Sequence, residues 1–137
     1  MSLVLDCSVT AAWVFVDETT EEVGQIFERV CEQGGWVPLL WRPEVANVLE
    51  MGVRRGRCGR GFVVDTLTDL EKLPITEDGD TSRHAWSSTL DLAARHQLTV
   101  YDAAYLELAI RRSLPLASID KELRAAAERE RVTLLAV

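Results

Sequence analysis

Four acidic residues stand where predicted strands give way to predicted helices. They are Asp6, Glu44, Asp102 and Asp120, and they follow the apolar segments 3–5, 36–40, 98–101 and 116–119. Ligands of an open parallel sheet bind at the carboxyl ends of its strands, which share one edge. We therefore expect four distant segments to bring their carboxylates together at that edge.

Carboxylates that are crowded together repel one another, and each raises the pKa of the others. A divalent cation relieves this repulsion, and Mg²⁺ or Mn²⁺ takes oxygen ligands. Almost no nitrogen or sulfur ligand accompanies the four acids, which argues against zinc. An acid-held Mg²⁺ or Mn²⁺ suits phosphoryl chemistry, because the ion binds a phosphate oxygen and activates water as the nucleophile.

Each acid also has a simpler interpretation when it is taken alone. Asp102 and Asp120 have the sequence context of helix N-caps, which contribute about 0.5–2 kcal/mol to stability. Glu44 in a first helical turn favours the helix dipole, whereas Asp6 ends a buried strand and is harder to explain in this way. The convergence of all four acids favours a metal site.

Small polar residues near the acids are candidates to hold ligands and water in place. They are Ser8, Asn47 and Ser118. Asn47 follows Glu44 by three residues, so both side chains share one helix face. The alternative for Ser8 is a hydrogen bond at the start of a helix, and the alternative for Asn47 is an ordinary surface amide.

One concentrated basic stretch is a candidate contact for a nucleic-acid backbone. It consists of Arg54, Arg55, Arg57 and Arg60. The alternative is a solvated, flexible junction. Trp13 and Trp86 occupy apolar helix positions and are predicted to lie in the core. Trp41 is predicted to pack partly in the core, with stacking on a base or on a protein side chain as the alternative.

The bulk composition is that of an ordinary soluble globular protein. The 137 residues fit one domain that spans 1–137. No segment approaches the roughly 18–20 apolar residues of a membrane span, and the first residues lack the pattern of a signal peptide. We therefore expect a cytoplasmic protein whose three cysteines are reduced. The net charge of −7 argues against loose, charge-driven binding of nucleic acid, although a bound cation reverses the local field.

Apolar runs alternate with helical patterns along the whole chain. Strands are predicted at 3–5, 36–40, 73–75, 114–119 and 132–137, with Pro38 near an edge or bend. Helices are predicted around 9–16, 23–33, 43–49, 63–70, 86–93, 102–110 and 120–129, with Gly34 stopping the second and a polar turn at 77–81. This alternation predicts a single α/β domain whose central parallel sheet is covered by helices on both faces.

Four of these segments resemble the motifs of the PIN-domain family, and most of all those of its VapC-type toxins. The segments are 3–8, 43–49, 101–109 and 116–123, in family order and at family-like spacing. The family's acidic quartet falls on Asp6, Glu44, Asp102 and Asp120, its hydroxyl residue before the last acid on Ser118, and its frequent asparagine on Asn47. Cys7 stands where alanine or serine is common, a departure that should matter little to the chemistry.

The resemblance implies a specific activity and specific partners. It implies a Mg²⁺- or Mn²⁺-dependent endoribonuclease that is the toxin of a type II toxin–antitoxin system. It also implies a homodimer that is silenced by a partner antitoxin, a protein whose peptide segment wraps the toxin.

Two other functions are compatible with a similar sheet. A metal-dependent phosphatase with an aspartyl nucleophile would normally carry a second acid two residues after Asp6, where this chain has Ser8. A receiver-like phosphoacceptor would need an acidic pair after the first strand, and none is present. The other alternative is a catalytically silent PIN scaffold that binds RNA or protein, and the four intact acids weigh against it.

Overall fold

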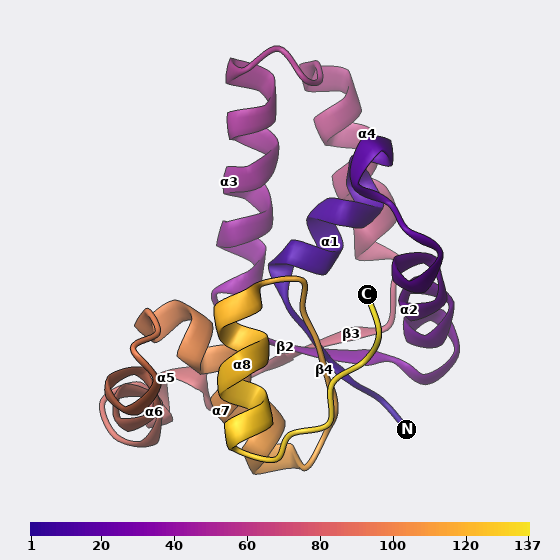
Figure 1. Cartoon of the computed structure of the whole chain (residues 1–137). Helices are drawn as coiled ribbons and strands as arrows, with labels where there is room; N and C mark the ends of the chain where they lie inside the picture. The colour runs from indigo at the N-terminus through magenta and orange to yellow at the C-terminus, as the bar shows by residue number, and fades with distance from the viewer.

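A parallel four-stranded sheet lies at the centre of the computed structural model, which describes residues 1–137 (Figure 1). The strands are β1 (Val4–Leu5), β2 (Gly35–Pro38), β3 (Ile75–Asp78) and β4 (Leu116–Ala117), in the order β3-β2-β1-β4. All three pairings are parallel, with Val4 opposite both Trp36 and Leu116. Because helices connect successive strands and lie on both sides of the sheet, the predicted α/β class is confirmed.

Eight α-helices and one short 3₁₀ helix surround the sheet. They are α1 (Cys7–Val14), η1 (Val16–Glu18), α2 (Glu21–Gln33), α3 (Trp41–Arg54), α4 (Arg60–Glu71), α5 (Thr81–His84), α6 (Ser88–His96), α7 (Val100–Arg112) and α8 (Lys121–Arg129). Figure 1 shows α3 and α4 extending away from the sheet as a hairpin. No helix combines the length and the apolar character that crossing a bilayer would require.

The core forms where β1 meets α7. Leu3, Val4 and Leu5 are completely buried, and every residue of α7 from 103 to 109 is buried as well. This helix is therefore enclosed on most of its sides. Since α7 contacts β1, β2 and β4, the first turn of this helix has a fixed position at the sheet.

Local signals define α2 as predicted. The Thr20 hydroxyl accepts a hydrogen bond from the N–H of Val23 at the start of the helix. Gly34 ends it with φ of +79°, a conformation that only glycine adopts without strain.

Three predicted strands are wrong or displaced. The third strand covers 75–78, so Glu77 belongs to the extended backbone and not to a turn. Residues 132–137 make a single bridge, from Leu134 to Leu116, instead of a strand. Residues 98–101 are not extended either, because Thr99 caps α7 and the helix begins at residue 100.

Pro38 and Trp86 were both singled out in the sequence. Strand β2 lies inside the sheet and not at an edge, but Pro38 is its last residue before the turn at residues 39–40, in agreement with the predicted bend. Trp86 lies between α5 and α6 and is 94% exposed. The helical spacing of Trp86 predicted a core position, but the helix is interrupted between α5 and α6, and this break leaves the side chain in solvent. Trp13 is half-buried and packs edge-on against Phe27, as a partial core residue.

Candidate active site

Asp6 is the buried centre of the acidic edge. Its backbone N–H donates to the carbonyl of Ala117, so the residue continues the pairing of β1 with β4. Its Oδ2 accepts hydrogen bonds from Ser8 Oγ at 2.6 Å and from Ser118 Oγ at 2.8 Å. Burial raises the pKa of Asp6 despite these two hydroxyls, and the charge of Asp120 raises it further.

The two serines also join the turns that follow β1 and β4. Ser8 Oγ accepts from the N–H of Ile119 at 3.0 Å, and Ser118 Oγ accepts from the N–H of Asp120 at 3.1 Å. Each hydroxyl thus donates to the carboxylate of Asp6 and accepts from the backbone beside Asp120. This arrangement determines where the two acids stand relative to each other.

Glu44 approaches the same edge from the first turn of α3. The Tyr105 hydroxyl, on α7, donates to Glu44 Oε1 at 2.5 Å. Burial of this carboxyl raises its pKa, the hydrogen bond from Tyr105 lowers it, and the charges of Asp6 and Asp102 raise it. The net pKa shift is upward.

Asp102 and Asp120 complete the group from the starts of α7 and α8. Asp102 is half-buried, and its pKa is raised by burial and by the charges of Asp6, Asp120 and Glu122. Its N–H donates to Thr99 Oγ1, so Thr99 and not Asp102 is the N-cap of α7. Asp120 is the N-cap of α8, with its Oδ1 accepting from Leu123 N–H at 2.8 Å.

The electrostatics of this edge are those of anions without a counter-ion. Among the influences on the pKa values of Asp6, Glu44 and Asp102, every charge is another carboxylate. An all-oxygen, multiply charged set fits a hard divalent cation in charge and in ligand type. As the side chains stand, no three of them are close enough together to hold one ion. A bound ion would therefore require the more exposed members to turn toward Asp6.

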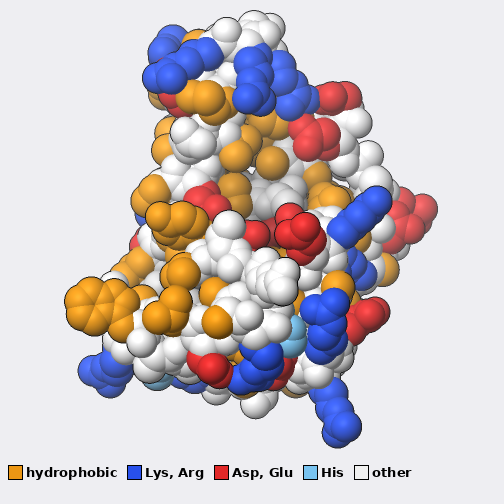
Figure 2. Space-filling model, turned by 60° about the vertical axis from the view of Figure 1, so that its left-hand side comes forward, with side chains coloured by type: hydrophobic (Ala, Val, Ile, Leu, Met, Phe, Trp, Pro, Cys, Tyr) orange, Lys and Arg blue, Asp and Glu red, His pale blue; other side chains and the backbone are white.

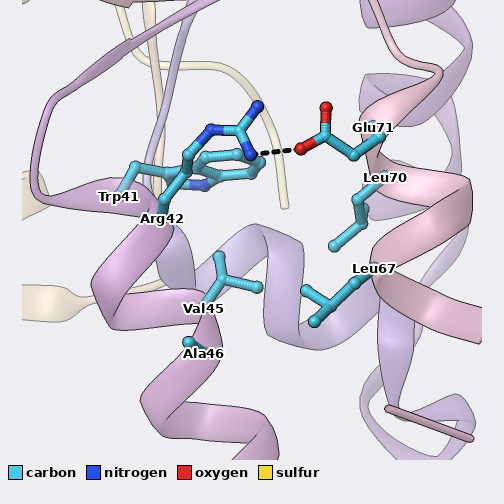
Figure 3. Close-up of a pocket in the computed structure, with 7 residues that line it drawn as sticks. All are labelled: Trp41, Arg42, Val45, Ala46, Leu67, Leu70 and Glu71. Atoms are coloured by element: carbon cyan, nitrogen blue, oxygen red, sulfur yellow. Dashed lines mark hydrogen bonds and ion pairs between the residues drawn. The ribbon is translucent and has the colours of Figure 1, made fainter. Parts of the chain in front are cut away.

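Asn47 and Arg42 do not join this group. Asn47 is exposed on α3, one turn after Glu44. Arg42 instead forms ion pairs with Glu71 and Glu77, and its pairing with Glu71 spans the mouth of a pocket between α3 and α4 (Figure 3).

That pocket is apolar and separate from the acids. It has a volume of about 240 Å³ and is lined by Trp41, Arg42, Val45, Ala46, Leu67, Leu70 and Glu71. Trp41 is buried and its Nε1 donates to Thr10 Oγ1 at 3.0 Å. The predicted core role of Trp41 is therefore confirmed, and its ring is not free to stack on a base.

The basic stretch lies at the tip of the α3–α4 hairpin, away from the strand ends (Figure 1). Arg57 pairs with Asp17 and Glu18, and its guanidinium lies 4.0 Å above the ring of Phe15. Arg54 and Arg60 both pair with Glu50. Three of the four arginines thus have acidic partners, which reduces the charge that this tip offers to RNA.

Sequence reasoning missed three residues that bear on the acids. Tyr105 follows Asp102 by three residues and so shares its helix face, which was the available signal. Thr99 and Asp102 have the spacing of a capping pair. Glu122 lies in the first turn of α8, and its charge raises the pKa of Asp102.

The fold and the site define a class: a small parallel α/β domain with an acidic cluster at the carboxyl edge of its sheet. The PIN domain family model matches residues 3–129, and the chain belongs to this family. PIN domains are in general metal-dependent nucleases, so the chain belongs to a family of nucleases.

Two solved structures show the same fold. PAE2754 from Pyrobaculum aerophilum is 21% identical, with a TM-score of 0.68 over 92% of this chain and 84% of that chain. FitAcB from Neisseria gonorrhoeae is 15% identical, with a TM-score of 0.56 over 99% of this chain and 97% of that chain. At these identities the likeness concerns the fold. A search of curated protein sequences found no significant match.

Proposed function

We propose that this protein is a Mg²⁺- or Mn²⁺-dependent endoribonuclease that hydrolyses RNA phosphodiester bonds with water. Asp6, Glu44, Asp102 and Asp120 are the proposed metal-binding and catalytic residues. The observation that carries the proposal is that acids from four segments stand at one sheet edge and none of them forms an ion pair with a basic side chain. Burial, and then the charges of neighbouring carboxylates, raise the pKa values of Asp6, Glu44 and Asp102. Such a group is unfavourable by itself and becomes favourable around a divalent ion.

The side chains have distinct parts in this proposal. Ser8 and Ser118 hold Asp6 in one orientation, and Asn47, which is exposed one turn after Glu44 on α3, would bind a water of the ion. Tyr105 holds Glu44 by Oε1, which leaves Oε2 to accept a proton. When bound, the ion would supply a Lewis acid for the phosphate and lower the pKa of a water.

The biological role that we propose is that of a toxin in a type II toxin–antitoxin system. The support is membership of the PIN family together with the likeness of the four motifs to VapC-type toxins. The proposal includes a cytoplasmic homodimer and a cognate antitoxin that silences it. An adjacent short reading frame that encodes a DNA-binding head and a disordered tail would support this role.

The activity is tested with Asp6→Asn and Asp102→Asn. We expect each to reduce cleavage of a single-stranded RNA in Mn²⁺ by more than about 100-fold, because groups that only support metal ligands already contribute about 10- to 100-fold. Folding should be retained, since the substitutions relieve repulsion. Asp65→Asn on the exposed face of α4 is the matched control and should cleave normally.

Two results would contradict the proposal. If both variants cleave RNA at the parental rate, the assignment of these residues to the active site is wrong. Hydrolysis of an aryl phosphate without any cleavage of RNA would favour the phosphatase alternative instead.

A further inference from the structure

A polar groove runs along α8 from Lys121 to Arg129. It has a volume of about 300 Å³ and is lined by His96, Gln97, Lys121, Glu122, Ala125 and Arg129. Lys121 directly follows Asp120, so one end of the groove borders the acidic edge. Figure 2 shows acidic side chains around a hollow in the middle of one face, with basic side chains and a histidine nearby on the same face.

Lys121 and Arg129 give this groove its positive charge. They are eight residues apart in one helix with Ala125 between them, so all three share a face of α8. Both cations are exposed, and neither forms an ion pair with an acid. They differ in this respect from Arg54, Arg57 and Arg60 of the hairpin tip.

The other lining residues form the walls of the groove. His96 Nε2 lies 2.6 Å from Glu130 Oε2, so this histidine is already engaged. Glu122 also lines the groove, and its charge raises the pKa of Asp102. The separation of Lys121 and Arg129 along the helix axis is roughly 12 Å, so the two cations would contact different phosphates of one strand.

We propose that this groove binds the sugar–phosphate backbone of the RNA substrate, with Lys121 and Arg129 each contacting one phosphate. The inference rests on the proposed nuclease function. A chain with a net charge of −7 needs cations close to its acids for a polyanion to approach them, and these two unpaired cations line the groove that borders the acidic edge. Backbone contacts of this kind position the strand without reading its sequence.

The test compares three double variants that each remove two positive charges. The groove variant is Lys121→Gln with Arg129→Gln. The control is Lys72→Gln with Arg131→Gln. Lys72 precedes β3, and Arg131 lies near Pro115, the residue before β4. Both control residues therefore lie toward the amino ends of the strands, opposite the acidic edge. The third is Arg54→Gln with Arg55→Gln at the hairpin tip.

Cleavage of a single-stranded oligoribonucleotide in Mn²⁺ is measured over a series of salt concentrations. For the groove variant we expect KM to rise by about tenfold or more while kcat stays within about twofold. The dependence of log KM on log salt should become shallower by about 1.4, which is 0.7 for each lost phosphate contact. The conservative pair Lys121→Arg with Arg129→Lys should restore both values.

A groove variant that behaves like the control, or a larger loss of affinity in the hairpin-tip variant, would overturn the inference. If the parent protein fails to cut RNA, the proposed function is wrong. Binding of RNA to the groove is then tested separately. Fluorescence anisotropy measures the affinity of a labelled oligoribonucleotide for the Asp6→Asn protein. In that measurement, equal affinity with and without the groove substitutions overturns the inference, and a weaker, less salt-dependent affinity supports it.

Discussion

Asp6 and Glu44 differ in what holds each carboxylate in place. Asp6 is buried and receives two serine hydroxyls on one oxygen. Glu44 is half-buried and receives the hydroxyl of Tyr105. Both pKa values are raised. At the scale of residues, therefore, hydroxyl donors counteract part of the penalty that burial places on the charged form.

Tyr105→Phe should weaken the site without disrupting the fold. The hydrogen bond from Tyr105 lowers the pKa of Glu44, so its removal raises that pKa. We expect the acid limb of the cleavage profile to move to higher pH and the affinity for Mn²⁺ to fall by about 10- to 100-fold. The free energy of unfolding should fall by about 1 kcal/mol.

Tyr101→Phe in the same helix is the control, because Tyr101 is exposed. Calorimetric titration with Mn²⁺ and pH profiles of cleavage make the comparison. An acid limb that stays in place in Tyr105→Phe would show that the tyrosine does not act through Glu44.

A buried ion network joins two elements, the end of β3 and the last turn of α7. Arg111 donates to Asp78 through both terminal nitrogens and to Glu107 through Nε and Nη2. Burial alone would raise the pKa of Asp78, but the hydrogen bonds and charge of Arg111 together with the hydrogen bonds from Asp80 N–H and the Thr81 hydroxyl outweigh it, and the pKa is lowered. Asp78 also ends a strand at the acidic edge, yet this pairing makes it a structural acid.

Arg111→Met should destabilise the protein by about 3–5 kcal/mol, because it leaves two buried carboxylates without their cation. Arg95→Met is the matched control. Arg95 pairs with Asp91 and Glu130 in an exposed setting, and its loss should change stability by less than about 1 kcal/mol. Urea denaturation measures both. Equal losses would mean that the buried network contributes no more than a surface pair.

At the scale of the whole molecule, two sets of acids respond to pH in opposite directions. Asp6, Glu44 and Asp102 have raised pKa values, so the folded state binds their protons more tightly than the unfolded state does. The cost of burying these charges, together with their repulsion, appears as pH rises above their ordinary pKa values of 3.8 and 4.5. The paired acids have lowered pKa values, and their stabilisation is lost as pH falls; they are Glu50, Glu71, Asp78 and Glu130.

Metal-free Asp6→Asn should therefore become more stable relative to the parent as pH rises from about 4 to about 7. Added Mn²⁺ should stabilise the parent at neutral pH by about 2.7 kcal/mol at 100 times its Kd, and EDTA should reverse the effect. Asp6→Asn should gain much less from Mn²⁺. Urea denaturation with and without the ion tests this. An equal gain in both proteins would place the ion elsewhere.

The sequence by itself determined the α/β class, most of the helices, and the positions of the four acids after apolar segments. These features depend on local signals: hydrophobic periodicity, the glycine that ends α2, and Asp120, the capping residue that begins α8. Ser8 and Ser118 were also within reach, because they stand two residues from Asp6 and Asp120 respectively.

Only the tertiary structure decided which charged groups meet. Tyr105 reaches Glu44 across 61 residues of sequence, and Arg111 reaches Asp78 across 33. The same holds for Arg57 of the hairpin tip, which meets Asp17 across 40 residues, and for Trp86, which the break between α5 and α6 leaves in solvent. Hydrophobic periodicity indicates which face of a segment is buried. The partner of a charged side chain depends instead on how distant segments pack against one another. This packing distinguishes the candidate metal ligands from the acids that only stabilise the fold.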